Sequence, residues 1–194
     1  ISDGIAIGRA HLLSHAYSEV AHYEVDVVAI DSEIKRFDKA ITKARNDLLQ
    51  LKDRIPRNSP TEFEAFIKLH LLILDDPILS EAPKTKITEL LCNAEWALKL
   101  QLETLLEKFL AIKDDYLSER RNDIIQVVER VLRILYGEGE NQKILNSDEK
   151  IIIVAHDISP AELIQYKNQN LTSFITDVGG TTSHTAIIAR SLNV

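Results

Sequence analysis

The sequence is poor in several features that define whole classes of protein. Its single cysteine, Cys92, has no partner for a disulfide within the chain. Cys92 lies in an apolar helical pattern, which indicates a small core residue, and a lone thiol fits the reducing cytoplasm. The sequence has no apolar run long enough to span a bilayer and no visible signal peptide. We therefore expect a cytoplasmic protein without membrane insertion.

Positive charge is also in short supply. The 194 residues include 23 lysines and arginines against 30 aspartates and glutamates, which gives a formal net charge of -7. This excess of negative charge argues against a general nucleic-acid-binding protein, and it suits the recruitment of a basic partner. Hydrophobic residues make up 45% of the chain, so we expect a packed core within one large or two small domains.

The middle of the chain has the periodicity of helices. From Asp31 to Ile55, apolar residues recur in alternating steps of three and four, which predicts an amphipathic helix that Pro56 ends. Three further helices are predicted over residues 61–74, 83–112 and 116–136. Gly137 is placed to cap the last of them. These helices and their short connections predict a helical bundle.

The helix predicted over residues 61–74 carries more apolar residues than one buried stripe needs. Two interpretations stay open for this excess. The helix is buried on several sides within the bundle, or some of its apolar side chains face a partner protein.

Both ends of the chain predict strands. Residues 4–13 have a strand-like pattern, and Ile151–Ala155 is a buried-strand signal. Ser159-Pro-Ala-Glu162 then combines a cap, a proline and a closing glutamate, which predicts a helix to about residue 167. A strand over residues 174–178 and a helix from about His184 complete a strand–helix–strand–helix order, which is typical of an α/β domain.

The turn before His184 has the residues that a phosphate site needs. Two glycines allow a tight turn, and the hydroxyls after them can cap a helix whose free N–H groups and dipole favour an anion. His184 is the candidate nucleophile at the start of this helix, and Arg190 is a candidate charge partner. The alternatives are a structural histidine in an ordinary turn and a surface arginine. The candidate phosphate-stabilising residues are Gly180, Thr181, Thr182, Ser183 and Arg190.

The string Gly179-Gly-Thr-Thr-Ser-His-Thr-Ala-Ile-Ile-Ala-Arg190 closely resembles the phosphohistidine signature of the phosphoenolpyruvate-utilising enzymes. That family includes enzyme I of the sugar phosphotransferase system, pyruvate phosphate dikinase and phosphoenolpyruvate synthase. The resemblance implies that His184 accepts a phosphoryl group and passes it on.

Three other segments resemble the enzyme I branch of the family. They are Ser2-Asp-Gly-Ile-Ala-Ile-Gly-Arg-Ala, Asp115-Tyr-Leu-Ser-Glu-Arg120 and Val154-Ala-His-Asp-Ile-Ser-Pro160. A helical middle, where the dikinase and synthase place an ATP-grasp domain upstream, also favours enzyme I. The resemblance implies a mixed fold: an α/β phosphohistidine domain over residues 1–30 and 138–194, with an all-α helical-bundle subdomain inserted over residues 31–137.

The resemblance also implies partners. It implies transfer of a phosphoryl group from phosphoenolpyruvate to the carrier protein HPr, which docks on the helical subdomain. The contacts carried over are Glu62, Leu72, Ile73, Leu79, Phe109, Leu117 and Arg120. In enzyme I, Mg²⁺ and phosphoenolpyruvate bind a C-terminal barrel that this sequence does not contain, and that missing domain is expected to form a homodimer. We expect no metal within these 194 residues.

The sequence departs from the family pattern at a position near the histidine. A threonine that supports the histidine in well-known family members aligns with Leu163. Two alternatives to the sugar system stay open: a nitrogen-regulatory paralogue of enzyme I, and the swivelling domain of a dikinase or synthase. The sequence upstream and downstream in the full gene would distinguish them.

Overall fold

The computed structural model of the chain describes residues 5–13, 20–54, 61–110, 115–137, 149–158, 160–167, 169–177, 184–192 and 194. Contacts divide the chain into two compact units. The first, here called the α/β unit, comprises Ile1–His15, Leu51–Phe66 and Gln142–Val194. The second, here called the helical unit, comprises Ala16–Gln50 and Ile67–Asn141. The domain boundaries predicted at residues 30/31 and 137/138 stay a prediction.

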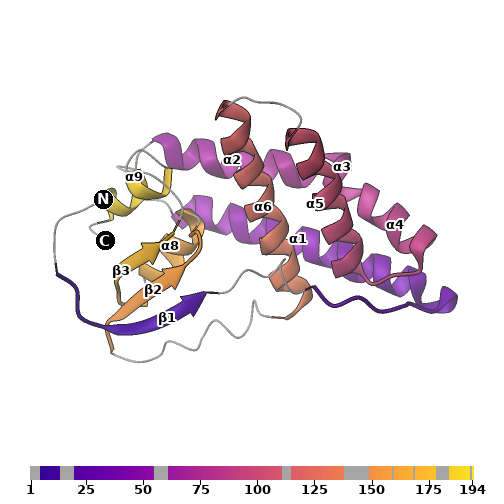
Figure 1. The fold of residues 1–194 in the computed structure, drawn as a ribbon, viewed down its shortest axis with the longest axis horizontal. Coiled ribbons are helices and arrows are strands. Elements are labelled where there is room, and N and C mark those ends of the chain that lie inside the picture. Colours follow the sequence, from indigo (N-terminus) through magenta and orange to yellow (C-terminus); the bar gives the residue numbers. More distant parts are fainter. Residues whose placement is uncertain are drawn as a thin grey trace. The chain divides into compact units, whose positions relative to one another are not determined.

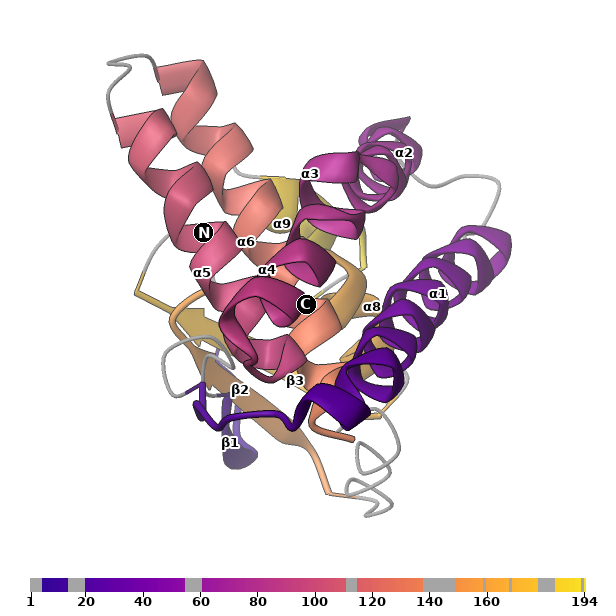
Figure 2. The same cartoon turned by 90° about the vertical axis from the view of Figure 1, so that its right-hand side faces the viewer.

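The helical unit holds most of the helices in Figure 1. They are α1 (Ile30–Arg54), α2 (Thr61–Asp75), α3 (Pro77–Ser80), α4 (Ala82–Leu90), α5 (Ala94–Leu110) and α6 (Asp115–Leu135), of which α1 and α2 run across the boundary between the units. A short 3-10 turn, Val27–Ala29, leads into α1. Figure 2 shows α5 and α6 side by side.

The amphipathic stripe of α1 is buried as its spacing predicts. Phe37, Ala44 and Leu48 are fully buried, and the charged residues between them face outward. The predicted cap at the end of α6 is confirmed, because Gly137 has a φ of 75°, a conformation that glycine adopts without steric penalty.

The prediction of one continuous helix over residues 83–112 is wrong. The helix ends at Leu90, and Leu91 adopts a left-handed conformation with a φ of 49° before α5 begins at Ala94. The cause is tertiary. Val25 donates its N–H to the Leu91 carbonyl, and Glu33 of α1 accepts the Ala94 N–H at 2.7 Å. A carboxylate from another helix therefore caps α5, which is a contact that local sequence does not encode.

The α/β unit is built on a parallel sheet of three strands in the order β1-β2-β3. The strands are β1 (Arg9–Leu13), β2 (Ile151–Ala155) and β3 (Leu171–Thr176), followed in sequence by α8 (Pro160–Lys167) after β2 and α9 (His184–Ser191) after β3. β2 has the bounds that the sequence predicts, whereas β3 begins and ends earlier than the predicted 174–178. With the helical bundle, this sheet gives the predicted mixture of an all-α part and an α/β part.

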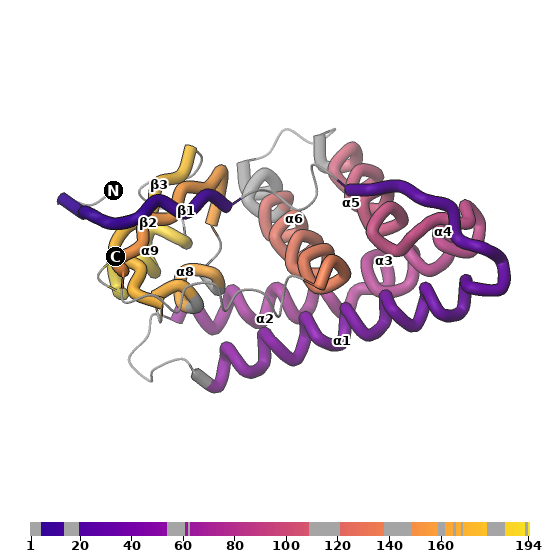
Figure 3. Tube along the Cα trace, turned by 90° about the horizontal axis from the view of Figure 1, so that it is seen from below, coloured from indigo at the N-terminus to yellow at the C-terminus, as the bar shows by residue number. Residues whose placement is uncertain are grey.

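One face of β2 carries the core of the α/β unit. Ile151, Ile153 and Ala155 alternate along the strand and point to this face, where they cluster with Leu163 of α8 and Ala189 of α9. Both helices therefore cover the same side of the sheet, and they lie below the strands in Figure 3. On the opposite side, Leu12 and Ile175 are 75% and 58% exposed.

Gly8 makes the entry to β1 possible. The Arg9 N–H donates to the Lys150 carbonyl at 2.8 Å, and a Cβ on Gly8 would lie 2.5 Å from that same oxygen. A side chain at position 8 would therefore push β1 away from β2.

Candidate functional site

The candidate phosphate site lies at the carboxyl edge of the sheet. Because the three strands are parallel, Leu13, Ala155 and Thr176 all end at this edge, where α/β proteins place their ligand sites. His184 is the first residue of α9, the next described element after β3. The backbone at the start of α9 is the positive end of a helix, which favours a bound anion.

The structure describes His184 by its backbone alone. The turn residues that precede it lie outside the described residues: Gly180, Thr181, Thr182 and Ser183. Their assignment to the phosphate site stays a prediction.

The start of α9 is held firmly in the α/β unit. Thr185 donates its hydroxyl to the Ile158 carbonyl at 2.8 Å, which ties the first turn of α9 to the segment after β2. Ala186, Ile188 and Ala189 are all buried, so one face of the helix packs into the interior. The backbone position of His184 is therefore fixed by both a hydrogen bond and packing.

A histidine and an aspartate also meet at the carboxyl edge. His156 directly follows β2 and Asp177 directly follows β3, and the His156 Nδ1 lies 2.7 Å from the Asp177 Oδ1. Their side chains are 51% and 69% exposed. Sequence reasoning did not select either residue. Their position in the sequence could have indicated them, because each directly follows a strand. A parallel sheet brings the ends of neighbouring strands to the same edge.

Arg190 lies in the last turn of α9 and is exposed. Arg190 lies six positions after His184, which corresponds to about 9 Å along a helix axis. A cation at this end interacts favourably with the helix dipole. The role of Arg190 as a charge partner of the phosphoryl group stays a prediction.

Leu163 occupies the position where the resemblance expects a supporting threonine. Its side chain is fully buried in the core cluster of the α/β unit, beside Tyr166 and the β2 face. A side chain at position 163 therefore contributes to the packing of α8 on the sheet, and the described contacts that hold the start of α9 come from other residues.

The predicted partner contacts lie in α2, α3, α5 and α6. Leu72 is 70% exposed, Ile73 is half-buried and Leu79 is buried. Most of the large apolar side chains of α2 are buried or half-buried, whereas that of Leu72 is exposed. The remaining predicted contacts are described by their backbones alone: Glu62 in α2, Phe109 in α5, and Leu117 and Arg120 in α6.

The structure brings two of these residues together around one apolar hollow. Ile73 and Leu79 line a cavity of about 330 Å³ in the helical unit. The other lining residues are Asp76, Ile78, Leu105, Lys108 and Ile124. Leu79 therefore forms part of the cavity wall although its side chain is almost fully covered.

A buried histidine of α2 lies near an aspartate of α6. His70 of α2 is 1% exposed, and its Nε2 lies 3.8 Å from the Asp123 Oδ1 of α6. Burial lowers the pKa of His70, and Asp123 opposes part of that shift. In the sequence of α2, His70 lies one turn before Ile73, and in α6, Asp123 directly precedes Ile124. Ile73 and Ile124 both line the cavity.

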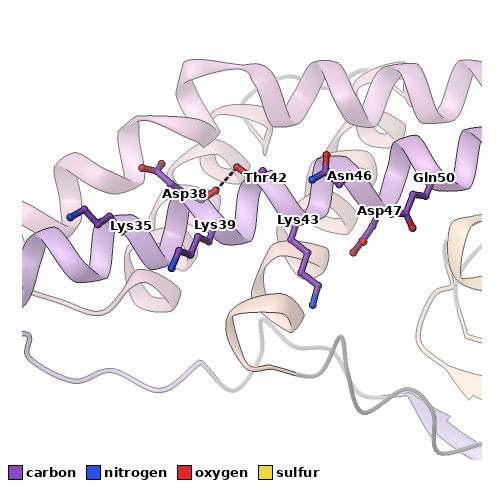
Figure 4. A pocket seen from close by; sticks show the side chains of 8 residues that line it. All are labelled: Lys35, Asp38, Lys39, Thr42, Lys43, Asn46, Asp47 and Gln50. Carbon is purple, nitrogen blue, oxygen red and sulfur yellow. Dashed lines mark hydrogen bonds between the residues drawn. The ribbon is translucent and has the colours of Figure 1, made fainter.

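A second hollow lies along the outer face of α1 and has a different character. Its lining alternates lysines with aspartates and amides, all from α1: Lys35, Asp38, Lys39, Thr42, Lys43, Asn46, Asp47 and Gln50. Figure 4 shows these side chains and the hydrogen bond from the Thr42 hydroxyl to the Asp38 carbonyl. This mixture of charges is typical of a solvated helix face.

In the part of the chain that the structure describes, no three histidine, cysteine, aspartate or glutamate side chains gather to hold a metal ion. None of the described helices combines the length and the apolar character needed to cross a membrane.

Curated relatives match this chain along its whole length. The phosphoenolpyruvate-protein phosphotransferase of Cupriavidus necator is 45% identical over 202 residues, which cover 100% of this chain and 34% of that protein. The phosphotransferase of the same name from Listeria innocua is 34% identical over 193 residues, which cover 100% of this chain and 33% of that protein. This chain thus spans about a third of the length of the curated relatives it matches.

A solved structure agrees with the fold. A solution structure of Enzyme I superposes with a TM-score of 0.73 and 29% identity, over 100% of this chain and 77% of that chain. The family described as "PEP-utilising enzyme, N-terminal" matches residues 1–120, and the one described as "PEP-utilising enzyme, mobile domain" matches residues 147–194. The chain therefore belongs to the phosphoenolpyruvate-utilising enzymes and carries their N-terminal domain together with the matched part of their mobile domain.

Proposed function

We propose that this chain is the phosphocarrying part of a phosphoenolpyruvate-protein phosphotransferase that moves a phosphoryl group through His184 to the carrier HPr. The observation that carries the proposal is the position of His184 as the first residue of α9, at the carboxyl edge of a parallel sheet. The names of relatives that match the whole chain support the reaction class.

The proposed chemistry is two successive phosphoryl transfers. A nitrogen lone pair of the His184 imidazole attacks the phosphorus of phosphoenolpyruvate, and an N–P bond forms as the P–O bond to the enol oxygen breaks. The electron pair leaves on that oxygen, and the enolate takes up a proton to give pyruvate. A histidine of HPr then attacks the same phosphorus, and the N–P bond to His184 breaks.

This chain would bind and orient the phosphoryl group during both transfers. The free N–H groups at the start of α9 are suited to stabilise its oxygens. Gly180, Thr181, Thr182, Ser183 and Arg190 are the further groups proposed to stabilise it. The binding of phosphoenolpyruvate and Mg²⁺ is proposed for another part of the full-length protein, as is the homodimer contact.

HPr is proposed to dock on the helical unit. Leu72 supplies an exposed apolar side chain, and Ile73 and Leu79 supply part of the wall of an apolar cavity in the same unit. The net charge of -7 complements a basic partner and would speed its association. This arrangement separates the docking surface from the reacting histidine along the sequence.

Labelling of the full-length protein tests the proposal. We expect incubation with labelled phosphoenolpyruvate and Mg²⁺ to give an acid-labile label on His184, and we expect His184→Ala to abolish it. A label on His11, His15, His22, His70 or His156 would contradict the assignment. The 194-residue chain alone should take no label from phosphoenolpyruvate, because the substrate site is proposed to lie elsewhere.

A further inference from the structure

Two contacts bracket the segment that runs from β3 to α9, and both are made to the same short stretch after β2. At the start of the segment, Asp177 pairs with His156 at 2.7 Å. At its end, Thr185 donates its hydroxyl to the Ile158 carbonyl at 2.8 Å. Residues 156–158 therefore hold both the exit from β3 and the first turn of α9.

The stretch that receives these contacts is itself well anchored. It follows β2, the central strand of the sheet, and it leads into α8. The Ile158 side chain is fully buried in the core cluster, and the Ile158 N–H donates to the Asp157 carboxylate at 2.8 Å. A group attached to this stretch is therefore positioned relative to the sheet.

The His156–Asp177 pair has little weight as a contribution to folding. Both side chains are more than half exposed, and exposed ion pairs contribute about 0–1 kcal/mol to stability. Reaction rates are more sensitive to position, since a misplacement of about 1 Å can lower a rate about 100-fold. A contact of small energy can therefore have a large effect when it sets the geometry of a reacting group.

We propose that His156 is a positioning residue for His184. Its Nδ1–H donates to Asp177 and fixes the exit from β3, while the Thr185–Ile158 hydrogen bond fixes the start of α9. Together they hold the His184 backbone where the phosphoryl group is transferred. This inference rests on the proposed function of His184. The neutral imidazole with its proton on Nδ1 and the imidazolium both supply this donor.

Paired substitutions in the full-length protein test the role. His156→Ala removes the donor, whereas His156→Asn keeps an N–H donor at nearly the same distance from the backbone. Arg9→Ala is the matched control, because the Arg9–Glu149 pair is equally exposed but lies at the amino edge of the same sheet. His184→Ala measures the background. The readouts are the kcat and the KM for HPr in transfer from phosphoenolpyruvate.

We expect His156→Ala to lower kcat about tenfold or more with the KM for HPr unchanged, because the carrier is proposed to dock on the helical unit. His156→Asn should restore kcat to within about threefold of wild type, by keeping the hydrogen bond. Arg9→Ala should match wild type. A wild-type kcat in His156→Ala, or an Asn variant as slow as the Ala variant, would overturn the positioning role.

A second readout is independent of catalysis. Amide hydrogen exchange at Thr185 and Ala186 should be faster in His156→Ala than in His156→Asn, because the segment that leads from β3 into α9 has lost one of the two contacts that bracket it. Equal exchange in the two variants would overturn the inference. If His184→Ala were still phosphorylated at the wild-type rate, the proposed function itself would fail, whatever the result at His156.

Discussion

The two units differ in how far the side chains of these polar and charged contacts are exposed. In the helical unit, Arg36 lies between Glu33 and Glu95, with contacts of 2.6 and 2.7 Å, and the two carboxylate side chains are only 12% and 6% exposed. In the α/β unit, Arg9–Glu149 and His156–Asp177 have all four side chains more than half exposed. Among the described pairs, the helical unit thus contains a largely buried network beside its exposed surface pairs, whereas these two pairs of the α/β unit lie exposed at the two edges of its sheet.

The buried charges of the helical unit connect helices that lie far apart in the sequence. Arg36 bonds to Glu95 of α5 and to the Leu135 carbonyl at the end of α6, while Glu33 caps α5. Burial by itself would raise the pKa of Glu95, but hydrogen bonds from Arg36 and Asn93 outweigh it and hold the pKa below its usual range. The network therefore keeps its charges at neutral pH and fixes the arrangement of three helices.

The edge charges of the α/β unit have a different consequence. The core of this unit is an apolar cluster on one face of β2, which needs no ion to complete it. The His156–Asp177 pair at the carboxyl edge therefore lies outside this core, where we propose that it serves the chemistry. Four experiments test how the two units differ.

The largest effect is expected from breaking the interior network. Arg36→Leu leaves the Glu95 carboxylate buried without its cation, and such a loss typically costs about 3–5 kcal/mol. Urea unfolding followed by the fluorescence of Trp96, the single tryptophan, reports on this unit because Trp96 lies in α5. Arg9→Ala on the sheet edge is the control, with an expected change below about 1 kcal/mol. Equal losses in the two variants would remove the distinction between the units.

The second effect tests whether position 163 serves packing. Leu163→Thr introduces a hydroxyl and a cavity into the core of the α/β unit, and we expect a loss of about 2–4 kcal/mol. Protection of the Ile153 amide from hydrogen exchange should fall, while the Trp96 transition stays unchanged. If the Leu163→Thr variant were as stable as wild type and transferred the phosphoryl group faster, position 163 would instead have a role in supporting His184.

The third effect concerns the surface of the helical unit. Leu72→Ala should weaken HPr binding about 5- to 30-fold, as truncation of a hot-spot residue does, without changing stability by more than about 0.5 kcal/mol. Leu90→Ala is the matched control, because Leu90 of α4 is 52% exposed and is not among the predicted contacts. Calorimetric titration at low and high salt measures both. Unchanged affinity in a folded Leu72→Ala variant would exclude Leu72 from the docking surface.

The smallest effect is a pH dependence that belongs to the helical unit. Burial lowers the pKa of His70 below the value of about 6.5 for an unfolded chain, so the unfolded state binds more protons below that pH. Stability is therefore complete above about pH 7 and falls as the pH drops through 6.5, by at most about 0.8 kcal/mol at pH 6. His70→Gln should remove this slope in unfolding measurements by Trp96 fluorescence. A slope that persists in the variant would assign it to another group.

The sequence by itself determined the helices, strands and turns that depend only on neighbouring residues. The alternating steps of three and four define α1, the run of β-branched residues defines β2, and Gly137 ends α6 in a conformation open to glycine. The helix that the sequence predicts from about His184 begins at that residue. In each case the physical cause, backbone preference or side-chain periodicity, acts over neighbouring residues.

Only the tertiary structure decided where distant groups meet. The helix break after Leu90 depends on Glu33 and on the strand-like segment near Val25, which lie far away in sequence. The His156–Asp177 pair exists because β2 and β3 are parallel neighbours, which brings the residues after both strands to one edge. These contacts are absent from the sequence pattern because each is created by folding, when long-range packing brings together groups that have no local preference for one another.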